Sequence, residues 1–78
     1  MTIREQFGIA IIKLRKARNL SQERFAIEAG IDRRYMSDIE NGRRNVSLDI
    51  IERICKKMDI SLSELFKFVE QVIDKENI

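Results

Sequence analysis

Residues 22–39 read QERFAIEAGIDRRYMSDI, and this stretch decides the fold. Ala26 and Gly30 stand four residues apart within it. Apolar residues surround that pair, at Phe25, Ala29, Ile31, Met36 and Ile39. A small side chain such as Ala26 lets two short helices cross closely, and Gly30 tolerates the positive φ of a tight turn. The pattern is therefore typical of a helix-turn-helix motif.

Three further helices are predicted around this motif, because apolar residues recur at helical spacing and the chain has no Pro. We expect helices over residues 2–18, 22–29, 33–41, 48–58 and 62–75. The expected caps are Ser21, Asp32, Ser47 and the Ser61–Glu64 capping box at the starts, and Asn19, Gly30 and Gly42 at the ends. The predicted fold class is all-α, a compact five-helix bundle.

Two of these helices carry well-defined apolar stripes that we expect to face the core. The stripe of the first helix comprises Ile3, Phe7, Ala10, Ile11 and Leu14. The stripe of the fourth comprises Leu48, Ile51, Ile54, Cys55 and Met58. Cys55 is expected to act as a small buried hydrophobic residue, because nothing beside it except Lys56 and Lys57 favours a reactive thiolate.

Composition excludes several classes of function. The chain has 78 residues, and we expect residues 1–78 to form one domain. It contains no His, which removes the zinc sites and base-assisted nucleophiles that depend on it. The one Cys cannot form an intrachain disulfide. No segment approaches the roughly 18 apolar residues of a transmembrane helix, and no signal-peptide pattern is present, so we expect a cytoplasmic protein.

The net charge of +2 is unevenly distributed. Residues 1–46 carry 10 basic and 6 acidic side chains, a net of +4, whereas residues 47–78 carry 5 basic and 7 acidic ones, a net of −2. The first part therefore attracts a polyanion and the second does not. This division places nucleic-acid binding on the helix-turn-helix part, whose second helix typically enters the DNA major groove.

The motif also carries a family resemblance. Residues 14–26, LRKARNLSQERFA, and residues 30–42, GIDRRYMSDIENG, resemble the Cro/CI-type (XRE) helix-turn-helix family. Residues 32–37, followed by Glu40 and Arg44-Asn45, more narrowly resemble restriction–modification controller proteins, which are small dimeric regulators. The resemblance covers about residues 7–66. It implies a lambda-repressor-like DNA-binding domain of bacterial or phage origin. The resemblance also implies a cytoplasmic protein that is associated with the nucleoid. It also implies an ion pair between Arg15 and Glu40 that orients the third helix.

The first turns of the helix over residues 33–41 carry the side chains expected to read bases. A guanidinium of Arg33 or Arg34 can contact guanine O6 and N7. Two arginines at a helix start oppose the helix dipole, which favours a role in binding over a role in stability. Ser37 can contact a base or a phosphate, or be a neutral surface residue. Asp38 can accept from a cytosine amino group or, as we favour, pair with Arg34 at i+4.

Phosphate contacts are expected on either side of that helix. Tyr35 can reach a phosphate, or its ring can pack between the third and fourth helices; the resemblance favours DNA. Gln22 lies in the first turn of its helix, where free backbone N–H groups bind phosphate. The connector after Gly42 is basic and favours phosphates over bases. The expected DNA-binding residues are Gln22, Arg33, Arg34, Tyr35, Ser37, Arg43, Arg44 and Asn45.

The last helix is expected to form a homodimer contact. Its apolar residues span about 160° of arc at 100° per residue, more than a small core is expected to cover. The alternative is a wide core face with a frayed tail. The expected interface residues are Leu65, Phe68, Val69 and Val72. Two copies would read a pseudo-palindrome in double-stranded DNA.

The leading interpretation is a sequence-specific, DNA-binding transcriptional regulator. The alternative is a protein-interaction module, such as an antitoxin or adaptor, that uses the same fold with Ile9, Ile12 and the last helix as its contact surface. An enzyme is not expected, because the sequence has no His, no Gly-rich phosphate loop and no clustered metal ligands. No cofactor, metal, membrane or small-molecule ligand is implied.

Overall fold

Five α-helices follow one another along residues 1–72, which are the residues that this computed structural model describes. They span Ile3–Ala17 (α1), Gln22–Ala29 (α2), Arg33–Glu40 (α3), Leu48–Met58 (α4) and Leu62–Gln71 (α5). The same residues contain no strand, which confirms the all-α prediction. Within this part of the chain, no helix combines the length and apolar character that crossing a membrane requires.

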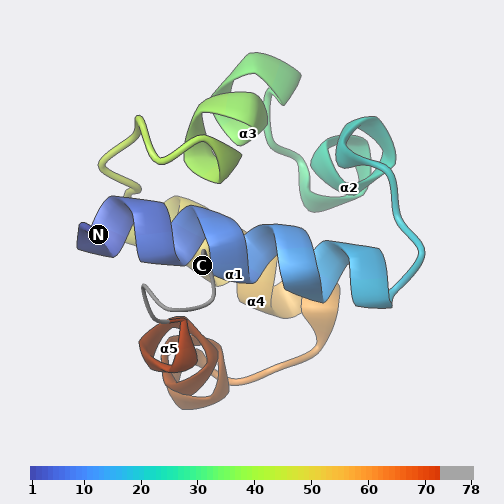
Figure 1. Cartoon of the computed structure of the whole chain (residues 1–78). Helices are drawn as coiled ribbons and strands as arrows, with labels where there is room; N and C mark the ends of the chain where they lie inside the picture. The colour runs from blue at the N-terminus through green and yellow to red at the C-terminus, as the bar shows by residue number, and fades with distance from the viewer. Residues whose placement is uncertain (73–78) are drawn as a thin grey trace.

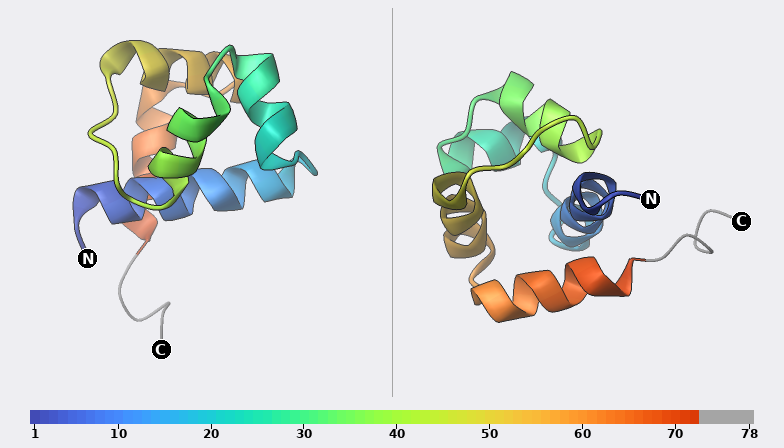
Figure 2. Two further views of the ribbon diagram at one scale, coloured as in Figure 1. Left: turned by 90° about the horizontal axis from the view of Figure 1, so that it is seen from above. Right: turned by 90° about the vertical axis from the view of Figure 1, so that its left-hand side faces the viewer.

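α1 runs through the middle of the bundle (Figure 1). It packs against α3 and α5, while α2 packs against α3 and α4, and α4 packs against α5. The helix-turn-helix pair α2–α3 therefore lies on one side of α1 and α5 lies on the other, as the perpendicular view also shows (Figure 2). This arrangement leaves the outer surface of α3 separate from the surface of α5.

All five helices contribute apolar side chains to one core. Its largest fully buried members are Phe25, Ile11, Met36, Ile39, Ile54, Leu65 and Val69. Two expected members are missing, because Ile3 is 60% exposed and Leu48 is 82% exposed. Each is the first residue of its helix, so the apolar stripe begins one turn before the packing does. Ala26 is fully buried where α2 approaches the rest of the core, as the motif predicts.

Side-chain caps set the helix starts as predicted. Ser21 and Ser47 each accept a backbone hydrogen bond from the residue three positions on, and Ser61 forms a complete capping box with Glu64. The residues that terminate three helices were also predicted correctly, since Asn19, Gly30 and Gly42 have φ of 57°, 70° and 72°, although α1 and α3 each end one residue earlier than predicted. Two local features were not predicted, namely a capping box between Thr2 and Glu5 and a left-handed Asp59 with φ 56°.

α5 ends earlier than the sequence suggests. The prediction extended it to residue 75, but the helix stops at Gln71 and Val72 is extended, with φ −77° and ψ 118°. The Gln6 amide of α1 donates a hydrogen bond of 2.9 Å to the Val72 carbonyl. A tertiary partner therefore takes the place of another helical turn at this carbonyl. The remainder of the predicted helix, from residue 73, lies outside the described residues.

Gly8 allows α1 and α3 to meet backbone to backbone. A Cβ atom built on Gly8 would lie 2.5 Å from the Ile39 carbonyl oxygen and 2.8 Å from that of Glu40. Carbonyl groups at the end of a helix cannot move aside as a flexible side chain can. Gly8 therefore sets the distance between α1 and the end of α3.

We expect Gly8→Ala to destabilise the protein by roughly 1–3 kcal/mol, the usual cost of an overpacked contact. Urea unfolding followed by circular dichroism measures this change. The sign of the change in unfolding free energy distinguishes the two cases, because Gly→Ala inside an ordinary helix stabilises it by about 1 kcal/mol. A stabilised Gly8→Ala variant would show that the crossing is not as close as the structure has it.

Candidate nucleic-acid interface

Arg33 and Arg34 begin α3 on the protein surface, but their surroundings differ. The Nη1 group of Arg33 donates to the carboxylate of Glu23 in α2 at 2.7 Å. The Arg34 side chain has no hydrogen bond or ion pair with any residue in the part of the chain that the structure describes. Asp32 accepts from the backbone N–H groups of Arg34 and Tyr35, so a carboxylate at the helix start offsets the unfavourable position of the two arginines.

Tyr35 is half-buried and packs against the core. The guanidinium carbon of Arg44 lies 4.2 Å from the centre of the ring, which is a cation–π contact. The hydroxyl group also accepts a long hydrogen bond, 3.5 Å, from the backbone N–H of Ser47. Tyr35 thus holds the connector between α3 and α4. This packing is closer to the expected alternative, a ring packed between the third and fourth helices, than to a side chain free to contact DNA.

Asp38 holds the basic connector against α3. Its carboxylate lies 3.1 Å from Nη2 of Arg44 and 3.9 Å from Nη1 of Arg43. The expected pair between Asp38 and Arg34 is therefore wrong. The reason is the turn at Gly42, whose positive φ directs the following residues back along α3 until the Arg43 N–H donates to the Asp38 carbonyl at 2.9 Å.

The remaining polar residues on this surface are Ser37 and Asn45. Ser37 is half-buried, and the Asn41 amide donates to its carbonyl oxygen at 2.9 Å and contacts its hydroxyl at 3.4 Å. Asn45 is exposed in the connector. Asn45 is therefore the more accessible of the two to an incoming ligand.

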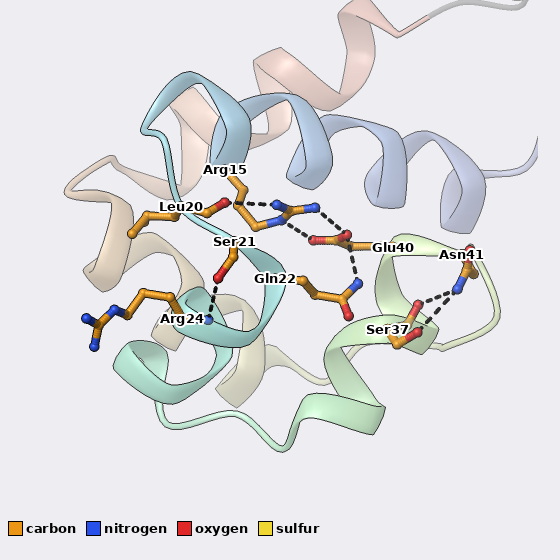
Figure 3. Close-up of polar contacts among 8 residues, drawn as sticks. All are labelled: Arg15, Leu20, Ser21, Gln22, Arg24, Ser37, Glu40 and Asn41. Carbon is orange, nitrogen blue, oxygen red and sulfur yellow. Dashed lines mark hydrogen bonds and ion pairs between the residues drawn. The ribbon is translucent and has the colours of Figure 1, made fainter.

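Glu40 connects three helices through one carboxylate (Figure 3). Its oxygens accept from Nε of Arg15 at 2.7 Å and from Nη2 of Arg15 at 2.9 Å, which confirms the predicted ion pair between α1 and α3. The third guanidinium nitrogen donates to the Leu20 carbonyl at 2.9 Å. The side chains of Arg15 and Glu40 are only 10% and 5% exposed. Hydrogen bonding to Glu40 raises the pKa of Arg15, so the buried cation stays charged.

Gln22 completes this cluster instead of standing free. Its amide nitrogen donates to the Glu40 carboxylate at 3.0 Å (Figure 3). Gln22 lies in the first turn of α2 as expected, and one of its two amide N–H groups is already hydrogen-bonded to Glu40. The ion pair therefore orients both helices of the motif: α3 through Glu40 and α2 through Gln22.

Four arginines consequently gather around α3: Arg33 and Arg34 at its start, and Arg43 and Arg44 in the connector beside Asp38. Residues 1–72 include no group of three or more acidic or Cys side chains placed to hold a metal ion. Cys55 lies in the core, and burial raises the pKa of its thiol, which favours the unreactive neutral form. The chemistry available at this surface is recognition of anions and base edges.

α5 presents a different surface from the one expected. Leu65, Val69 and Val72 are buried inside the monomer, so three of the four predicted interface residues are already occupied by core packing. Phe68 is 41% exposed. Leu62 and Phe66 are also exposed, and the Phe66 ring lies 6.1 Å from that of Phe7. The exposed apolar residues of α5, here called the α5 patch, are therefore Leu62 and Phe66 on one side of the buried stripe and Phe68 on its other side.

Comparison with known proteins agrees with this geometry. Residues 11–65 match the family described as Helix-turn-helix. Control protein C.MunI of a Mycoplasma species is 50% identical over 70 residues, which are 88% of this chain and 95% of that protein. The chain belongs to the helix-turn-helix family of control proteins. Control protein C.BamHI of Bacillus amyloliquefaciens is 45% identical over 67 residues, which are 85% of this chain and 83% of that protein.

A solved structure of the same family shares the fold of this chain. It is the restriction–modification controller protein C.Esp1396I, crystallised as a tetramer in complex with its natural 35-base-pair operator. The TM-score is 0.81 at 27% sequence identity, over 91% of this chain and 93% of that chain.

One contact in this surface was missed from the sequence. Glu23 was not singled out, although it holds Arg33 across the two helices of the motif. The two residues are ten positions apart on different helices, so no periodicity within one helix connects them.

Removing the charge of Glu40 tests the role of the buried cluster. We expect Glu40→Gln to cost about 3–5 kcal/mol, because it leaves the Arg15 guanidinium buried without a counter-ion. Urea unfolding measures the loss, and Arg15→Met combined with Glu40→Leu should recover most of it. Arg24→Ala removes an exposed pair with Glu28 and should cost less than about 1 kcal/mol. Equal effects of Glu40→Gln and Arg24→Ala would contradict the structural role of the cluster.

Proposed function

We propose that this control protein is a sequence-specific transcriptional regulator that binds double-stranded operator DNA as a homodimer, in the context of a restriction–modification system. The observation that carries the proposal is the group of four arginines around the exposed start and end of α3. The relatives support it, since C.MunI and C.BamHI are control proteins and C.Esp1396I was crystallised with its operator.

In this proposal α3 enters the major groove. Arg34 has no partner within residues 1–72, so its guanidinium is available to a guanine O6–N7 edge. Arg33 reaches the same groove from its contact with Glu23. Ser37 lies one turn further along α3, beside the bases.

The groups beside α3 position the protein on the phosphate backbone. Arg43, Arg44 and Asn45 follow α3 in the connector, and Tyr35 supports Arg44 through its ring. Gln22 and the free N–H groups of the first turn of α2 contact phosphate on the other side. These contacts determine register and affinity, and the contacts from α3 determine sequence.

Homodimerisation is proposed to occur through the α5 patch. α5 lies across α1 from α3, so association through Leu62, Phe66 and Phe68 leaves the DNA-binding surface uncovered (Figure 1). A symmetric pair would then read two half-sites about 34–36 Å apart. One domain, residues 1–78, would carry both the reading surface and the subunit contact.

The alternative, a protein-interaction module such as an antitoxin, has less support, because this chain covers control proteins C.MunI and C.BamHI over 95% and 83% of their length. Regulation through binding involves no catalytic step, so the proposal assigns no enzymatic activity, cofactor or small-molecule ligand. It places the protein in the bacterial cytoplasm, associated with the nucleoid.

Selection of bound duplexes from random DNA should return a palindromic consensus. Arg33→Ala combined with Arg34→Ala should weaken binding to that consensus by at least tenfold, because one good bidentate base contact contributes about 1–3 kcal/mol. Fluorescence anisotropy at several salt concentrations measures the change, and the wild-type protein should show a steep negative log–log salt slope. Unchanged affinity of the folded double variant would refute the assignment of α3.

The subunit contact is tested separately. Phe68→Asp places a charge in the α5 patch and should weaken self-association by at least tenfold, measured by analytical ultracentrifugation. Ile27→Asp is a matched control, since Ile27 is also an exposed apolar residue, 66% exposed, but lies on α2. If the two variants associate as the unaltered protein does, the dimer uses another surface.

A further inference from the structure

The two arginines at the start of α3 are not equivalent, although they are adjacent in the sequence. Arg33 donates from Nη1 to Glu23 at 2.7 Å, and the side chains of Arg33 and Glu23 remain 63% and 60% exposed. Arg34 has no such partner within residues 1–72. Glu23 is the second residue of α2, so the contact spans the exposed face of the helix-turn-helix motif.

We propose that Glu23 is a positioning residue for base recognition, which holds the Arg33 guanidinium so that its opposite edge faces a guanine. This inference rests on the proposed function, because it assigns a role to Glu23 within the same DNA-binding surface.

The donor inventory of the guanidinium supports this role. The group is planar and carries five N–H donors, and Glu23 engages only Nη1. Nε–H and one N–H of Nη2 remain on another edge as two parallel donors, which match the O6 and N7 acceptors of guanine. A side chain that is already held in one orientation also loses less conformational freedom when it binds.

Stability does not explain the contact. An ion pair between two side chains exposed to this extent contributes little to folding. The Glu23 carboxylate also lies beside the groups expected to contact phosphate, where a negative charge repels any DNA regardless of sequence. A residue that weakens general attraction while orienting one base contact increases discrimination between sequences.

Glu28 offers a matched control on the same helix. Its carboxylate pairs with Arg24 at 3.3 Å and with the ammonium group of Lys57 in α4. The hydrogen bond from Lys57 lowers the pKa of Glu28, so Glu28→Gln removes a full charge at neutral pH, as Glu23→Gln is designed to do. Arg24 belongs to α2 and Lys57 to α4, so this carboxylate has no ion pair with α3.

The experiment compares three duplexes: the selected consensus, an unrelated sequence, and the consensus altered at the base pair where Arg33→Ala loses discrimination. Glu23→Gln should bind the unrelated duplex about threefold more tightly, and its discrimination at the altered base pair should fall about tenfold. Glu28→Gln should leave that discrimination unchanged. Thermal melting should show all variants folded, since each change lies on the surface.

A double-mutant cycle gives an independent readout. If Glu23 acts through Arg33, adding Glu23→Gln to Arg33→Ala should cause no further loss of discrimination. Additive losses, or equal effects of Glu23→Gln and Glu28→Gln, would overturn the inference while leaving the proposed function intact. Failure of the wild-type protein to select any consensus would overturn both.

Discussion

The buried carboxylate of Glu40 is the constraint on which the rest of this structure depends. It accepts two hydrogen bonds from Arg15 and one from Gln22, and so joins the central helix to both helices of the DNA-binding motif. A charged pair taken out of water is stable only when its hydrogen-bonding groups are satisfied. Leu20 supplies the missing acceptor from the turn before α2, and the start of α2 is thereby placed relative to α3. The geometry of the candidate nucleic-acid interface follows from this internal connection.

Local signals were read correctly from the sequence because their causes are local. Ser21 and Ser47 cap helices that begin one residue later, and Gly30 adopts the left-handed conformation that its missing Cβ permits. The apolar stripes were correct only inside the helices. Leu48 has the same periodicity as Ile51 but lies at the helix start, where the sequence carries no information about whether another helix covers it.

The positions of the candidate-site residues along the helices were predicted better than the contacts that these residues make. The arginines lie around α3 as expected, but Asp38 pairs with the connector and Glu23 pairs with Arg33. Both pairings depend on how the chain folds back after a turn. On α5, the breadth of the apolar arc suggested an uncovered surface, whereas α1 and α4 cover Leu65 and Val69 in the structure. Tertiary packing determines which side chains pair and which are covered, and the periodicity of a single helix carries no information about that packing.

The close approach of α1 to α3 has a consequence for how such a regulator can change. Gly8 meets the carbonyl oxygens of residues 39 and 40, at the far end of α3 from Arg33 and Arg34. Neither Arg33 nor Arg34, at the start of the helix, takes part in that contact with Gly8. In the proposed DNA-binding role, exchanging the first residues of α3 would therefore change the operator preference and leave the scaffold unaltered.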